Sequence, residues 1–142
     1  MTVFAVDTNI LVYAADRHAS DHVLCRNLLL EWTNGTAPWR LTWGVIYEFL
    51  RVVTHPRILR RTWALSESWR FVEVLLSSPG LRVRVETPRH AEITAQVFRE
   101  APDLCGSTLF DTHTAILMRE HGVRRIVTRD ADFRRFPFIE VV

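Results

Sequence analysis

Four carboxylates of this 142-residue chain stand at positions where they could build a metal site: Asp7, Glu48, Asp111 and Asp130. Carboxylates that converge repel one another unless they are protonated or bridged by cations. Oxygen ligands without histidine or cysteine select hard divalent ions such as Mg²⁺ or Mn²⁺. Such a site suits phosphodiester hydrolysis, because bound metal ions position the phosphate, lower the pKa of a water and stabilise the leaving oxygen.

Asp7 and Asp130 each follow a predicted strand, at residues 3–6 and 125–128. Ligands of open parallel sheets bind beyond the carboxyl ends of the strands. Simpler interpretations stay open at this point: Asp7 could cap the next helix, and an Asx turn would account for one acid of the segment TRDADF. Asp132 lies in the same segment and is the alternative to Asp130 as the fourth acid.

Glu48 and Asp111 belong to predicted helices. Glu48 shares a helix face with Phe49 and Val52, and a carboxylate on an apolar face needs a partner because an unpaired buried charge is costly. Arg51 would be that partner in a purely structural interpretation. Asp111 begins a helix, where it could be a cap, and it lies above a row of inward-facing apolar positions.

The elements that must position these acids alternate short apolar strands with amphipathic helices, a pattern typical of a parallel sheet. Strands are predicted at residues 3–6, 41–43, 82–86, 125–128 and 138–142, the third at a sheet edge. Helices are predicted from about Ile10, from Ser20 or Asp21 to Asn34-Gly35, over 44–56, over 65–78, from Thr87-Pro88, and over 109–122. We expect one domain over residues 1–142, a three-layer α/β/α sandwich around about five mainly parallel strands.

Two apolar stripes at helical spacing are expected to be buried. They are Leu24, Leu28 and Trp32 on one helix, and Leu65, Trp69, Val72 and Leu76 on another. Cys25 and Cys105 form no CxxC pair, so we expect two buried or half-buried thiols rather than a zinc site or a disulfide.

The charge is nearly balanced, at +2, and all 18 basic residues are arginine. Arginine matches phosphate oxygens bidentately, and Arg57, Arg60, Arg61 and Arg129 are candidates for RNA contacts, although solvated faces would look similar. No run approaches the ~18 apolar residues of a membrane span, and the N-terminus lacks the features of a secretory signal. We therefore expect a cytoplasmic protein without a membrane partner.

Four segments resemble, in order and spacing, the PIN-domain ribonucleases, and most closely the VapC toxins of bacterial toxin-antitoxin pairs. They are VDTNILVYA, EFLRVVTHPR, FDTHTAILMREHG and IVTRDADFRRF. The resemblance implies that Asp7, Glu48, Asp111 and Asp130 are the catalytic and metal-binding acids, with Asp132 as the alternative ligand. It also implies that Thr8, Asn9 and Thr128 support them, and it restricts the capping interpretation to Thr8 and Asn9.

The resemblance further implies a Mg²⁺-dependent endoribonuclease in which Mn²⁺ can substitute, acting on RNA that in this subgroup is often tRNA or rRNA. It implies a homodimer and a VapB-like antitoxin. Relatives carry small apolar residues after the third acid, whereas this chain has Thr112, His113 and Thr114, and we interpret His113 as a surface or supporting residue. The alternatives are a catalytically silent RNA- or protein-binding PIN module and a PIN-like nuclease of RNA processing.

Overall fold

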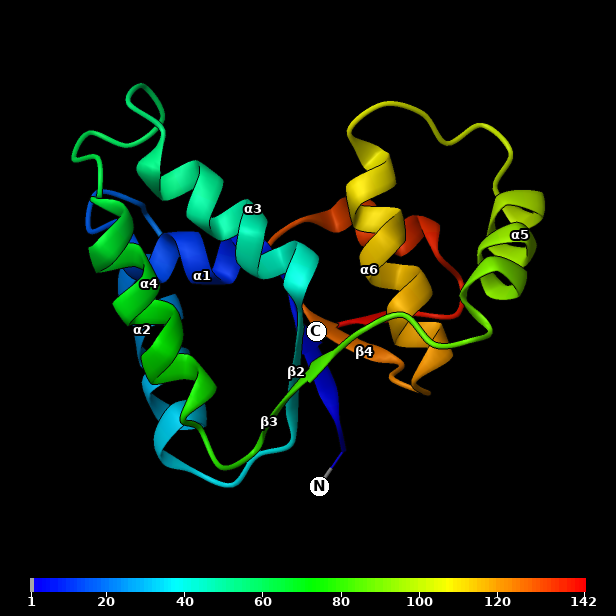
Figure 1. The fold of residues 1–142 in the computed structure, drawn as a ribbon, viewed down its shortest axis with the longest axis horizontal. Coiled ribbons are helices and arrows are strands. Elements are labelled where there is room, and N and C mark those ends of the chain that lie inside the picture. Colours follow the sequence, from blue (N-terminus) through cyan, green and yellow to red (C-terminus); the bar gives the residue numbers. More distant parts are fainter. Residues whose placement is uncertain (1) are drawn as a thin grey trace.

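The computed structural model describes residues 2–142, and its centre is one five-stranded sheet (Figure 1). The sheet order is β3-β2-β1-β4-β5, and every neighbouring pair is parallel. The strands are β1 (Phe4–Val6), β2 (Trp39–Thr42), β3 (Leu81–Arg84), β4 (Arg125–Val127) and β5 (Glu140–Val141). The predicted parallel sheet is confirmed, with β3 at its edge, and all strands present their carboxyl ends on the same side.

Six helices cover the two faces of the sheet (Figure 1). On one face lie α1 (Thr8–Ala15), α2 (His22–Asn34), α3 (Trp43–Thr54) and α4 (Leu65–Leu76), and on the other α5 (His90–Glu100) and α6 (Thr108–Glu120). Successive strand residues point to opposite faces. Accordingly Val6 packs in the α1–α4 core and Ala5 in the α5–α6 core. The three-layer α/β/α sandwich is confirmed.

Capping side chains explain where two elements differ from the prediction. Thr42 Oγ1 accepts a hydrogen bond from the Val45 amide at 3.0 Å, so α3 begins at Trp43 and β2 ends before it. Residue 43 is therefore helical, not the last strand residue. Helix α1 begins at Thr8, two residues earlier than predicted, because the carboxylate of Asp7 accepts from the Thr8 amide.

The buried stripes of α2 and α4 are shifted relative to the prediction. In α2, Cys25 and Leu29 face the core with Trp32, whereas Leu24 is 47% exposed. In α4 the core residues are Ser68, Val72 and Leu75, while Leu65 (66%) and Trp69 (40%) are exposed. The helical spacing of the apolar residues was predicted correctly, but the buried face of each helix was not. Which face is buried depends on the neighbouring helix or strand that packs against it.

The two cysteines have different environments. Cys25 is fully buried, as predicted, but Cys105 lies exposed in the α5–α6 loop, which corrects the expectation of a second shielded thiol. Both thiols are free. Across residues 2–142, every helix is too short or too polar to span a lipid bilayer.

Candidate active site

The four acids come from four elements and line one cavity of about 430 Å³. Asp7 and Asp130 follow β1 and β4, which are neighbours in the sheet, so their side chains leave the same edge. Glu48 lies on α3 and Asp111 in the first turn of α6. Helices α3 and α6 belong to opposite layers (Figure 1), so the cavity lies where the two layers meet beyond the sheet.

Asp7 both caps a helix and faces the cavity. One carboxylate oxygen accepts from the Thr8 amide at 2.8 Å, and the other accepts from Thr128 Oγ1 at 2.8 Å and Asn9 Nδ2 at 3.3 Å. The side chain is only 6% exposed. Restricting the capping role to Thr8 and Asn9 was therefore wrong, because capping uses one oxygen and leaves the carboxylate at the cavity.

Thr128 connects the first acid to the fourth. Its hydroxyl donates to Asp7 and accepts from Asn9 Nδ2 at 3.1 Å and from the Asp130 amide at 3.0 Å. The hydroxyl thus uses its donor and two acceptor positions inside the protein. Thr128 is 5% exposed, so this network holds the loops after β1 and β4 in a fixed relation.

We expect Thr128→Val to destabilise the protein by about 1–3 kcal/mol, because the substitution keeps the shape and removes one buried hydrogen bond, to Asp7, and two half-buried ones, from Asn9 and the Asp130 amide. Thermal unfolding checks this, and the pKa of Asp7 should rise further, because the Thr128 hydroxyl lowers it. Thr36→Val is the matched control at an exposed position. Equal melting temperatures of the two variants would contradict this role of Thr128.

Burial and mutual repulsion raise the pKa of two of the acids. The pKa of Asp7 is raised from 3.8 to about 6, mainly by burial and also by the charges of Glu48 and Asp130, against the hydrogen bonds from Thr128 and Thr8. The pKa of Asp111 is raised to about 7 by burial, followed by the charges of Asp7, Asp130 and Glu48. Acids that perturb one another in this way share one electrostatic site.

Glu48 is half-buried and contacts α1 rather than its own helix. Its Oε2 accepts from Thr8 Oγ1 at 3.2 Å, so Thr8 supports the second acid. Among the ion pairs of residues 2–142, none joins Glu48 to Arg51. The structural interpretation of Glu48 as half of an intrahelical pair is not supported.

Asp130 and Asp132 are distinguished by their positions. Asp130 lines the cavity, and it caps the short 3₁₀ helix Ala131–Arg135 by accepting from the Asp132 amide at 2.9 Å. Asp132 is exposed and is not among the cavity residues, although its charge contributes last and least to the raised pKa of Asp111. The geometry favours Asp130 as the fourth acid.

The donors at this cavity fit a hard divalent cation. They are carboxylate oxygens, with the hydroxyl and amide side chains of Thr8 and Asn9 beside them and no histidine or thiol among the lining residues. No three of the four carboxylates have oxygens that all lie within 4.8 Å of one another in the described residues. Within residues 2–142, the one group of three metal-ligating side chains that close together is Glu86, His90 and His113.

Sequence reasoning missed the His113 group and the apolar wall of the acidic cavity. Val12, Tyr13 and Val52 complete that wall. The Glu-x-x-x-His spacing of residues 86–90 was the one local signal of the histidine group, and His113 follows 23 residues later. Thr112 and Thr114, which depart from the apolar pattern of the resemblance, are buried in α6.

The candidate RNA-contacting arginines lie in two places. Arg57, Arg60 and Arg61 lie exposed in the loop between α3 and α4, where Arg61 pairs with Glu67 at 2.8 Å. Arg129 lies at the acidic cavity and pairs with Asp21 at 3.0 Å.

Comparison with known proteins identifies the fold family. The PIN domain profile matches residues 4–139. The chain belongs to the PIN-domain family. This PIN domain is 32% identical over 138 residues to the protein named Ribonuclease VapC48 of Mycobacterium tuberculosis, covering 95% of this chain and 92% of that protein. It is 29% identical over 134 residues to Ribonuclease VapC43 of the same organism, covering 94% of this chain and 90% of that one.

Solved structures share the fold of this PIN domain. VapC20 of Mycobacterium tuberculosis, described as a sarcin-ricin loop cleaving toxin, superposes with a TM-score of 0.69 at 19% identity, covering 97% of this chain and 98% of that one. VapBC2 from Rickettsia felis, solved with a promoter DNA fragment, gives a TM-score of 0.68 at 17% identity, covering 99% and 98%.

Proposed function

We propose that this chain, as one PIN domain over residues 1–142, is a metal-dependent endoribonuclease and the toxin of a VapBC-type toxin-antitoxin pair. The observation that carries the proposal is the cavity lined by Asp7, Glu48, Asp111 and Asp130 in a PIN domain with relatives named ribonucleases. All four acids are present at one cavity, which favours turnover over a catalytically silent binding module.

The proposed roles follow from the contacts of each acid. Asp7, Glu48, Asp111 and Asp130 would hold Mg²⁺, or Mn²⁺ in its place, and the ion would supply an activated water and stabilise the leaving oxygen. Thr128 and Asn9 hold the Asp7 carboxylate in its orientation, and Thr8 holds that of Glu48. In the metal-free chain, burial and the neighbouring acids raise the pKa of Asp111 to about 7, so a cation that binds there would displace a proton near neutral pH.

The experiment that tests the proposal is cleavage of a pool of structured RNA by the purified chain. We expect cleavage with Mg²⁺ or Mn²⁺ and none in EDTA, with tRNA and rRNA substrates in the pool. Cleavage that survives EDTA would contradict a metal mechanism. Metal binding without cleavage of any RNA would establish the silent binding module instead, and mature-end products from precursor RNA would indicate a processing nuclease.

The proposal includes two protein partners, a VapB-like antitoxin and a second copy of the chain. It also places the protein in the cytoplasm. Exposed aromatic side chains support an interface: Tyr47 is 68% and Phe110 71% exposed, and they line a cavity of about 580 Å³ between α3 and α6. Large exposed apolar side chains that gather at one place mark interaction surfaces. The mass in solution tests the homodimer, and a monomer at micromolar concentration would contradict it.

The α3–α4 loop is proposed to contact the RNA backbone. We expect Arg57→Gln with Arg60→Gln to raise KM several-fold with little change in kcat, and to reduce the slope of log affinity against log salt by about 1.4, at 0.7 per phosphate contact of single strands. Arg89→Gln is the control, at an exposed arginine that immediately precedes α5 and pairs with Glu92. An unchanged salt slope in the double variant would show that this loop is only solvated surface.

A further inference from the structure

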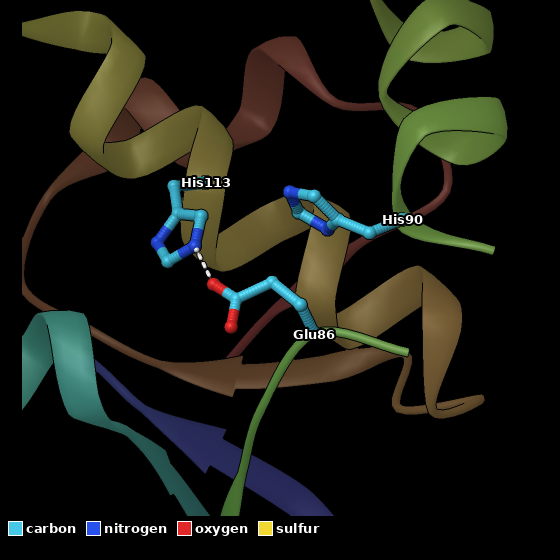
Figure 2. Close-up of side chains that lie close together, drawn as sticks. All are labelled: Glu86, His90 and His113. Atoms are coloured by element: carbon cyan, nitrogen blue, oxygen red, sulfur yellow. Dashed lines mark hydrogen bonds and ion pairs between the residues drawn. The ribbon is translucent and has the colours of Figure 1, made fainter. Parts of the chain in front are cut away.

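A second group of metal-ligating side chains lies outside the acidic cavity. Glu86 follows β3, His90 begins α5 and His113 lies on α6, and one ligand atom of each lies within 4.8 Å of the others. Figure 2 shows the Glu86 carboxylate beside the His113 ring, with His90 close by, and His113 Nε2 lies 2.7 Å from Glu86 Oε1. Three segments far apart in the sequence therefore bring two nitrogens and one carboxylate together.

A buried carboxylate orients His90 toward this group. Glu120, whose side chain is 0% exposed, places Oε2 2.6 Å from His90 Nδ1. Its Oε1 accepts from the amide and the hydroxyl of Thr87, at 2.9 and 2.7 Å. Because a carboxylate only accepts, His90 Nδ1 donates, and the lone pair of the neutral ring is left on Nε2. A carboxylate behind the outer nitrogen is the usual support of a histidine that binds a metal.

We propose that Glu86, His90 Nε2 and His113 Nε2 bind Zn²⁺, with water as the fourth ligand. Two imidazoles and one carboxylate are a known zinc donor set, and tetrahedral bonds of 2.0–2.1 Å place ligand atoms about 3.3 Å apart. The side chains of His113 and Glu86 are 35% and 50% exposed, so solvent reaches the site and Glu86 is free to adjust. On binding, the His113 ring keeps one proton on Nδ1 and releases any proton held at Nε2.

The site is distinct in chemistry from the acidic cavity. Nitrogen donors favour Zn²⁺, whereas the oxygen-only cavity favours Mg²⁺. An ion at this second site joins the loop after β3, α5 and α6, and His113 stands two residues after Asp111 on α6. Bound Zn²⁺ therefore stabilises the position of α6, the helix that carries Asp111. The effect of Zn²⁺ is measured as thermal stability, so the test does not depend on whether the chain cleaves RNA.

The test is thermal unfolding of the full chain with ZnCl₂ in millimolar MgCl₂, which keeps the acidic cavity occupied by Mg²⁺. At a Zn²⁺ concentration about 100-fold above Kd, we expect the Tm to rise by roughly 5–10 °C. Glu86→Gln and His90→Gln should abolish the rise, and Glu120→Gln should weaken Zn²⁺ about 10–100-fold while keeping all three ligands. His18→Gln, at an exposed histidine in the α1–α2 loop, is the matched control.

Calorimetry and Co²⁺ substitution complete the test. We expect one equivalent of Zn²⁺ to bind, and Co²⁺ to give the intense visible absorption of a four-coordinate site, unchanged in Cys105→Ser and lost in Glu86→Gln. Glu86 is exposed, so this variant is decisive even if His90→Gln fails to fold. Equal Zn²⁺ affinity in wild type and Glu86→Gln, or a cobalt spectrum that depends on Cys105, would overturn the proposal and leave two ion pairs, His90–Glu120 and His113–Glu86.

Discussion

Replacing Asp7 by asparagine is expected to lower the rate of metal-dependent RNA cleavage by on the order of 10³-fold or more, because the cavity loses its most buried carboxylate. Asparagine keeps one oxygen for the Thr8 amide, so α1 stays capped. Its amide nitrogen has no free acceptor at Thr128, whose acceptor positions are used by Asn9 and Asp130. The loss should appear mainly in kcat.

The control for this substitution is Asp103→Asn, which removes the same charge from an exposed position in the α5–α6 loop. Its kcat should equal that of the wild type. Cleavage at the wild-type rate by a folded Asp7→Asn chain would mean that Asp7 is only a helix cap, and the proposed metal site would lose its first ligand.

Asp111→Asn is expected to raise the Tm of the metal-free protein near pH 8 by a few degrees, ~3–6 °C, even though it also removes cleavage. The carboxylate is half-buried, and burial with the charges of three other acids opposes its ionisation. Among the hydrogen bonds of residues 2–142, none is accepted by the Asp111 carboxylate. Asparagine at this position therefore removes the charge repulsion with the other acids without breaking a helix cap. Asp7→Asn should stabilise less because its hydrogen bonds with Thr128 and Asn9 are disturbed.

The pH dependence has a definite sign. The pKa values of Asp7 and Asp111 are raised from 3.8 to about 6 and about 7, so the folded state holds these protons more tightly than the unfolded state. Their contribution to stability is fully present below about pH 4 and is lost as the pH rises through 6 to 7. Between pH 5 and 8 the metal-free wild type should therefore lose more Tm than Asp111→Asn.

Magnesium should reverse that loss in the wild type at pH 8 and have little effect on Asp111→Asn, because cations that bind the folded state stabilise it. Differential scanning calorimetry over this pH range, with and without Mg²⁺, measures both effects. A lower Tm of Asp111→Asn than of the wild type at pH 8 would show that the Asp111 carboxylate stabilises the fold instead of straining it.

Much of the site could be predicted from the sequence because the end of a strand, and an acid that follows it, can be recognised from local residue types. Residues 3–6 are a short apolar run closed by Asp7, the predicted strand at 125–128 is followed two residues later by Asp130, and a parallel sheet brings such ends together. The inward face of Glu48 followed from helical periodicity. These inferences needed only local pattern and one topological rule.

The remaining features depend on tertiary contacts. The orientation of the Asp7 carboxylate depends on the Thr128 hydroxyl, which lies 121 residues away. The exposure of Leu24 and Trp69 reflects which row of each helix its neighbours cover. The Glu86, His90 and His113 group requires α5 and α6 to pack side by side, because only Glu86 and His90 are close in sequence and His113 follows 23 residues later.

The most direct test of the central claim is a Mn²⁺ titration followed by electron paramagnetic resonance, on the wild type and on Asp7→Asn, Glu48→Gln, Asp111→Asn and Asp130→Asn. We predict that the wild type binds Mn²⁺ that Mg²⁺ displaces, that each of the four variants binds at least about 10-fold more weakly, and that Asp103→Asn is unchanged. Binding of equal strength in the wild type and in both Asp7→Asn and Asp111→Asn would show that the four carboxylates do not form one metal site.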